Sequence, residues 1–119
     1  MKRLFVLAVL FTVPLLAQAQ EFLQVTTIES LVAGGLGRSR MITTGKNGEI
    51  QEVPLENFYS MTGINFQNVR NNDRTITQKI NELAKEGWEL MQVTSAAESS
   101  DKTTGIFISR YLFKRAATK

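Results

Sequence analysis

One segment with helical periodicity lies between β-prone segments, and it constrains the fold more than any other feature of this sequence. Thr75 and Gln78 have the spacing of a capping box, which predicts that the helix begins at Thr75. Gly87 suits the left-handed position that ends a helix. Between these ends, apolar residues recur with a period of 3.6, at Ile76, Ile80, Leu83 and Ala84. This spacing predicts that the helix has one buried face.

Before this helix, the sequence predicts three strands. Residues 21–30 are rich in β-branched and apolar side chains, which favours a strand. Residues 40–44 and 49–53 flank the pair Asn47-Gly48, a strong signal for a β-hairpin because both residues tolerate positive φ. Pro54 cannot donate to a ladder of hydrogen bonds and is expected to end the second arm.

After the helix, the sequence predicts two more strands, over residues 88–94 and 106–114, joined by a polar loop over 95–105. The last strand is apolar at both odd and even positions, which indicates a central strand covered on both faces. Trp88 is placed to close one end of the core. These elements predict an α+β domain, an antiparallel sheet of about four to five strands with one helix packed on one face.

The section 55–72 is the least regular part of the chain. Ile64 and Phe66 alternate with polar residues, which favours a short strand. Asn71, Asn72 and Asp73 are turn-forming residues and are expected to precede the helix. The section is nevertheless too apolar for a free linker, so part of it is expected to pack against the domain.

The first nineteen residues have the pattern of a cleavable secretory signal peptide. Lys2 and Arg3 precede the apolar run 4–16, and Ala17-Gln18-Ala19 is the small-x-small pattern of a cleavage site. A transmembrane anchor is the alternative, but it needs about 20 apolar residues, and this run is shorter. We expect cleavage before Gln20, a single domain over 20–119, no membrane span after cleavage, and a location in the periplasm or outside the cell.

Composition narrows the chemistry further. The chain has no cysteine and no histidine, which excludes disulfides, zinc sites built from those residues, and catalytic centres that need histidine or a thiol. Two of its fourteen basic residues lie in the leader, so twelve remain against eleven acidic ones. Because nucleic-acid binding domains carry a clustered basic excess, no nucleic-acid partner is expected. No cofactor or metal is expected either.

The second half of the chain resembles a known family. Residues 80–91, which include Glu86-Gly87-Trp88-Glu89, and the later run Tyr111-Leu112-Phe113-Lys114-Arg115 resemble the small bacterial domains catalogued as domain of unknown function 4177. The resemblance covers roughly 75–115, with 21–25 similar to the opening strand of the family. It implies a helix, a strand, a loop and a final strand. The family has no established activity, and the section 31–72 departs from its pattern.

Two sets of residues are candidates for binding. Glycines 34, 35 and 37 precede Arg38, Ser39 and Arg40, whose amides and guanidinium groups are the donors that an anion needs. A flexible turn with solvent-facing arginines is the alternative, because no complete phosphate-binding motif is present. Tyr59 is the aromatic residue most expected to be exposed, whereas Phe58 and Trp88 are expected in the core.

These observations predict a non-enzymatic binding or interaction module of the cell envelope, whose partner is an envelope protein or a glycan. The alternative is a small carboxylate-dependent hydrolase acting on glycan or cell-wall material, with Glu49, Glu52 and Glu56 as candidate carboxylates. On a hairpin arm these glutamates are more typical of a solvated, edge-protecting face. A homodimer formed through an edge strand is a further expectation.

Overall fold

A computed structural model describes residues 18–33, 38–101 and 104–117. One antiparallel sheet has the strand order β3-β2-β1-β7-β6, and a two-stranded sheet is formed by β4 and β5. The elements in chain order are β1 (Gln20–Ser30), β2 (Arg40–Thr44), β3 (Ile50–Pro54), β4 (Tyr59–Ser60), β5 (Gly63–Ile64), α1 (Phe66–Lys85), β6 (Glu89–Asp101) and β7 (Thr104–Ala116).

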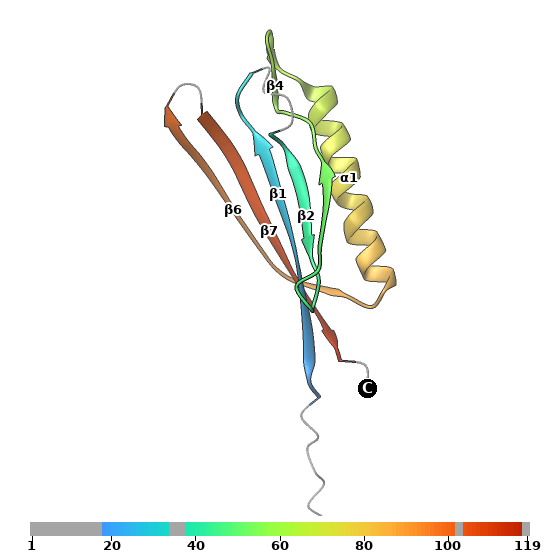
Figure 1. Ribbon diagram of the computed structural model, residues 1–119. Coiled ribbons are helices and arrows are strands. Elements are labelled where there is room, and N and C mark those ends of the chain that lie inside the picture. The colour runs from blue at the N-terminus through green and yellow to red at the C-terminus, as the bar shows by residue number, and fades with distance from the viewer. Residues whose placement is uncertain (1–17, 34–37, 102–103, 118–119) are drawn as a thin grey trace, which may run out of the picture.

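The helix covers one face of the large sheet, and the core lies between the two layers (Figure 1). Alternate residues of β1, beginning with Leu23 and Val25, point toward α1, as the period of two in a strand requires. The other buried apolar residues are Met41, Leu55, Ile76, Leu83, Trp88 and Phe113. The fold is therefore α+β with one helix on an antiparallel sheet, as the sequence predicts.

The helix is longer than predicted, and its start was placed wrongly. Asn65 is the N-cap, and its side-chain Oδ1 accepts a hydrogen bond from the Asn68 amide at 3.2 Å. Thr75 lies inside the helix, where its hydroxyl donates to the Asn71 carbonyl oxygen at 3.0 Å. The expected turn at 71–73 is consequently helical, and Phe66 begins the helix instead of belonging to a strand. The end was predicted correctly, because Gly87 follows it with φ +88°.

The last two strands form a longer hairpin than predicted. Residues 95–101 and 104–105 of the predicted loop are strand, since β6 continues to Asp101 and β7 begins at Thr104. β7 is an interior strand, paired with β1 on one side and β6 on the other. Its expected burial on both faces is wrong, because the face away from α1 leaves Arg110 and Ile106 exposed.

The predicted hairpin of β2 and β3 is present, with Thr44 opposite Ile50 and Arg40 opposite Pro54. Its connection is wider than a two-residue turn, because the Gly45 amide donates to the Glu49 carbonyl oxygen at 2.8 Å. Gly48 has φ +84°, and no described non-glycine residue has positive φ. Positive φ was therefore expected correctly at Gly48 and wrongly at Asn47.

Trp88 is buried in the core, as predicted, and Arg115 beside it belongs to a network of charged residues. The Arg115 guanidinium lies 4.1 Å from the centre of the Trp88 ring. The same group donates to the Glu86 carbonyl oxygen and to Glu21, each at 3.0 Å. Lys46 donates to the other oxygen of Glu21 at 2.8 Å. Hydrogen bonds from Lys46 and then Arg115 hold the pKa of Glu21 below its ordinary value.

The described fold begins at the predicted cleavage point. β1 starts at Gln20, and its first residue lies opposite Ala116 of β7. Every helix and strand and every buried core residue that the structure describes follows Ala19. The chain from Gln20 onward therefore contains every described helix and strand, and it lacks the hydrogen bond from the Ala117 amide to the Ala19 carbonyl oxygen at 2.9 Å.

Candidate interaction surfaces

The three residues of the predicted anion site do not have the same environment. Arg38 is exposed, whereas Ser39 is buried. The Ser39 hydroxyl accepts from the Ser30 amide and donates to Asn57 Oδ1, both at 2.8 Å. It therefore links the end of β1 to the segment between β3 and β4. Glycines 34, 35 and 37 lie outside the described residues.

Arg40 carries a carboxylate partner on the neighbouring strand. Its guanidinium lies 3.0 Å from Glu52 on β3, and both side chains are about half exposed. A shallow depression of about 340 Å³ is lined by Ser39, Arg40, Glu52, Val53 and Pro54. Because Glu52 lies in this depression, a bound anion would have to compete with that carboxylate for Arg40. The structure therefore does not bring Arg38, Ser39 and Arg40 together as one site, and anion binding at these residues stays a prediction.

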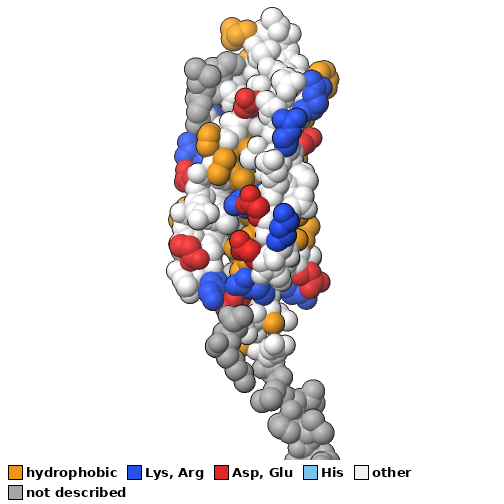
Figure 2. Space-filling view, turned by 90° about the vertical axis from the view of Figure 1, so that its right-hand side faces the viewer, with side chains coloured by type: hydrophobic (Ala, Val, Ile, Leu, Met, Phe, Trp, Pro, Cys, Tyr) orange, Lys and Arg blue, Asp and Glu red, His pale blue; other side chains and the backbone are white. Residues whose placement is uncertain are grey.

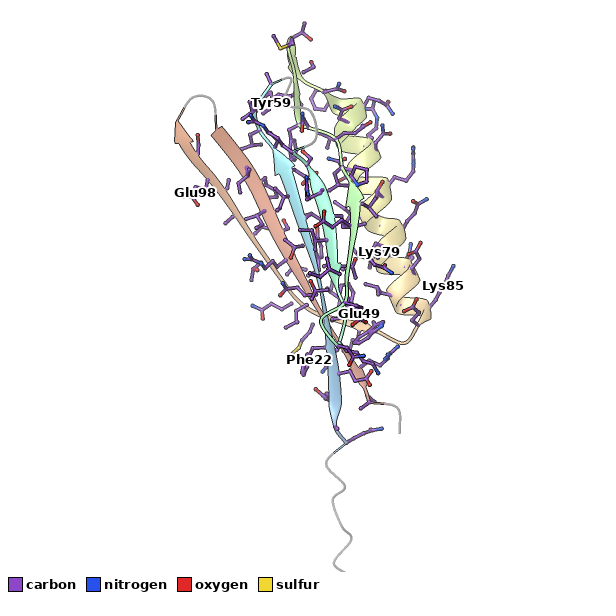
Figure 3. The ribbon with its side chains drawn as sticks, in the orientation of Figure 1. Phe22, Glu49, Tyr59, Lys79, Lys85 and Glu98 are labelled. Carbon is purple, nitrogen blue, oxygen red and sulfur yellow. The ribbon has the colours of Figure 1, made fainter. Side chains whose placement is uncertain are left out.

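Tyr59 is exposed, as predicted, and it belongs to a larger apolar surface. It lies on β4 directly opposite Ile64 of β5, at the end of the molecule far from the C-terminus (Figures 1 and 3). Four side chains form this surface, which we call the apolar tip. They are Tyr59, Met61, Ile64 and Phe66, with exposed fractions of 37, 84, 50 and 65%.

β6 provides a second surface, which we call the β6 edge. No strand pairs with its outer side in the described part of the chain. The described residues of this strand, 89–99, are all exposed, including Leu90, Met91 and Val93. Val93 lies opposite Tyr111 and so faces the helix side, yet it is 45% exposed because the core residues under α1 lie on β1, β2 and β7. The segment 90–97 carries no charged residue.

A buried polar group lies between the helix and the sheet. Asn72 of α1 donates through Nδ2 to Glu29 of β1 at 2.9 Å and to the Glu56 carbonyl oxygen at 2.7 Å. Its Oδ1 accepts from the Glu56 amide at 2.8 Å. Burial raises the pKa of Glu29, an effect that the Asn72 hydrogen bond opposes and nearby Asp73 reinforces. Burial, followed by Glu29 and Asp73, also raises the pKa of Tyr111.

Sequence reasoning did not identify this buried pair, although one signal for it was present. Leu23, Val25 and Thr27 alternate along β1 toward the core, and Glu29 is the next member of that series. The pattern of period two thus places an acidic residue on the buried face. Its partner could not be found, because 71–73 was interpreted as a turn and not as part of the helix.

The three candidate carboxylates of the alternative hydrolase have separate local partners. Glu49 accepts from the Asn47 amide at 3.0 Å, Glu52 pairs with Arg40, and Glu56 accepts from Asn71 at 2.9 Å. All three side chains are exposed. The residues that the structure describes contain no group of acidic side chains arranged to hold a metal ion. None of the described helices is long and apolar enough to cross a membrane.

Comparison with known proteins gave no relative for this chain: no protein-family model, curated protein or solved structure matches it.

Proposed function

We propose that this chain is a non-enzymatic interaction module that works outside the cytoplasm and binds a polypeptide by adding a strand to the β6 edge. The observation that carries the proposal is the exposed, uncharged segment 90–97 on an outer strand of the sheet. An edge strand presents a row of backbone donors and acceptors, and pairing with an extended chain satisfies them. The signal-like pattern of the first nineteen residues supports a location outside the cytoplasm. We also propose, from the resemblance described above, that the chain is a relative of domain of unknown function 4177.

The opposite edge of the sheet supports this choice of surface by contrast. β3 ends in Pro54, and Glu52 on it pairs with Arg40. Proline and charged side chains are the devices by which natural proteins prevent pairing at an edge. β6 has no proline and no lysine, and its acidic residues, Glu89, Glu98 and Asp101, lie outside the central segment. One edge is therefore protected and the other is open.

A second copy of the chain is the simplest source of the added strand. Antiparallel pairing of β6 with itself about a two-fold axis would join two five-stranded sheets into one. The small side chains of Ser95, Ala96 and Ala97 allow the two strands to approach closely. A different envelope protein with an extended segment would use the same backbone groups.

The test compares association before and after lysines are placed on the β6 edge. We expect the chain from Gln20 to dimerise in light scattering, or to capture a protein from envelope extract. Val93→Lys with Ala97→Lys should abolish that association, because charged side chains on an edge prevent pairing. Thr77→Lys with Asn81→Lys, on the exposed side of α1, is the matched control. Association that survives the β6 lysines would contradict the proposal, as would the absence of any association.

A further inference from the structure

The apolar tip is a surface distinct from the β6 edge. It consists of Tyr59, Met61, Ile64 and Phe66, and Met61 is 84% exposed at its outermost turn. The tip protrudes from the end of an elongated molecule, opposite the end where β1 begins and β7 ends (Figure 1). Figure 2 shows separate hydrophobic side chains at this upper end, with both basic and acidic side chains below them. A convex apolar surface of this kind suits insertion into another phase better than reception of a small ligand.

Hydrogen bonds hold the tip in a defined position. The Phe58 amide donates to the Ser30 carbonyl oxygen at 3.0 Å, and the Asn65 amide donates to the Phe58 carbonyl oxygen at 2.8 Å. Asn68 of α1 donates through its side chain to the Asn57 carbonyl oxygen at 3.0 Å. The hairpin of β4 and β5 is thus attached at its base to both layers of the domain. Its apolar side chains are presented by an ordered element.

The segment 57–72, which carries the tip, contains Arg70 and no acidic residue, and Glu56 and Asp73 flank it on either side. Arg70 is exposed and lies one helical turn after Phe66, so both are on the same side of α1. Arg38 is exposed next to Ser39, which bonds to Asn57 at the base of the hairpin. The first turn of α1 also has no acidic residue to offset the positive end of the helix dipole.

We propose that the apolar tip inserts into the surface of a bilayer that contains anionic phospholipids, while Arg38 and Arg70 contact headgroup phosphates. Peripheral proteins bind in this way when apolar side chains enter the acyl boundary and basic residues neutralise the lipid charge. The apolar side chains supply affinity for any bilayer, and the two arginines supply the preference for an anionic one. This role is independent of strand addition at the β6 edge, because the two surfaces share no residue.

The experiment measures sedimentation of the chain from Gln20 with vesicles, because this chain contains every described helix and strand and lacks the apolar leader. One set of vesicles is phosphatidylcholine alone, and the other contains about one third phosphatidylglycerol. Met61→Ser with Phe66→Ser should lower the partition coefficient at least about tenfold on the anionic vesicles. Ile50→Ser, which removes an apolar side chain that is 63% exposed on β3, is the matched control and should bind normally.

A second pair of variants tests the charge. Arg38→Ser with Arg70→Ser should lower binding to anionic vesicles by roughly fivefold for each residue. Added salt should likewise weaken the binding of the original protein to these vesicles. Arg110→Ser, an exposed arginine on β7, is the control. Equal binding to both kinds of vesicle would overturn the role of the arginines. If the original protein binds neither kind of vesicle, the membrane proposal is overturned. It is also overturned if Met61→Ser with Phe66→Ser still binds vesicles but no longer captures an envelope protein. That second result would assign the tip to a protein partner.

Discussion

The side chains of Asn72 and Glu29 meet between the two layers of the fold, with Asn72 Nδ2 2.9 Å from a carboxylate oxygen of Glu29. These residues are 43 positions apart in the sequence and come from α1 and β1. Asn72 also bonds to both the amide and the carbonyl oxygen of Glu56. One buried amide therefore connects the helix, the central strand and the section that leads to the apolar tip.

We expect Asn72→Ala to lower the free energy of unfolding by about 2–4 kcal/mol, because it leaves the buried carboxyl of Glu29 and the part-buried backbone groups of Glu56 without this partner. Urea unfolding measures this loss. Asn81→Ala, on the exposed side of the same helix, should change stability by less than about 0.5 kcal/mol. In a double-mutant cycle with Glu29→Ala, the two losses should be less than additive. Strict additivity would show that the two side chains are not coupled.

The stability of the fold should depend on pH through Glu29. Its folded-state pKa is raised by burial, so the folded chain binds this proton more tightly than the unfolded chain. The stability that the neutral carboxyl confers is complete below the ordinary carboxyl pKa and is lost as pH rises through the raised value. Glu29→Gln stays neutral, so its advantage over the original protein should grow from acidic to neutral pH in thermal unfolding.

Glu86→Gln is the control for this pH dependence, because Glu86 is exposed. Its stability should follow that of the original protein across the same range. If Glu29→Gln also follows the original protein at every pH, the raised pKa of Glu29 is refuted.

Replacement of Arg115 should weaken the packing around Trp88. Arg115→Met keeps the length of the side chain but removes the contact with the Trp88 ring and the hydrogen bonds to Glu21 and Glu86. We expect the free energy of unfolding to fall by about 1–2 kcal/mol. The fluorescence of Trp88, the single tryptophan of the chain, measures this unfolding. Arg110→Met, an exposed arginine on the same strand, should be close to neutral. Equal losses of stability in the two variants would contradict a stabilising role for the contacts of Arg115.

Gly87→Ala should destabilise the fold through the backbone alone. Gly87 has φ +88°, a conformation that alanine adopts only at a cost of about 1 kcal/mol. An added Cβ would lie 3.6 Å from Arg115 Cδ, which is an ordinary contact, so steric overlap adds nothing. Thermal unfolding should show a lower midpoint for Gly87→Ala and an unchanged or higher one for Thr77→Ala. An unchanged midpoint for Gly87→Ala would argue against the left-handed helix stop.

The proposed cleavable leader leads to a prediction that does not depend on folding. Signal peptidase reads small residues at the positions occupied by Ala17 and Ala19, so Ala19→Arg should block processing and leave a longer precursor. Gln18→Ser, between those positions, should be processed normally. Amino-terminal sequencing of the exported protein should begin at Gln20. A protein that begins at Met1 and stays with the cells would contradict the assignment of a cleavable leader.

Local sequence patterns were sufficient for much of the fold. The alternation along β1, the hairpin of β2 and β3, and the helix stop at Gly87 each depend on neighbouring residues, and each was predicted. The start of α1 was not, because Thr75 and Gln78 imitate a cap inside a helix whose true cap is Asn65. The extent of the β6–β7 hairpin was also not predicted, because the polar residues at 95–101 owe their strand conformation to pairing with β7.

The surfaces were less predictable than the fold, for a related reason. Tyr59 was singled out as exposed, but its association with Met61 and Phe66 requires the short hairpin and the early helix start. Ser39 was expected beside two arginines at a surface, and its burial follows from hydrogen bonds to Ser30 and Asn57. Exposure of β6 depends on where the helix lies over the sheet, which no local pattern specifies.

The position of β1 has a consequence for how the chain acquires its structure. Among the described elements, β1 is the middle strand of the large sheet and the first in sequence, while its long partner β7 is the last. A chain still emerging from the ribosome therefore cannot complete the centre of its sheet until Ala116 has been made. Because such long-range pairing is slow, β1 stays without its β7 partner through most of synthesis.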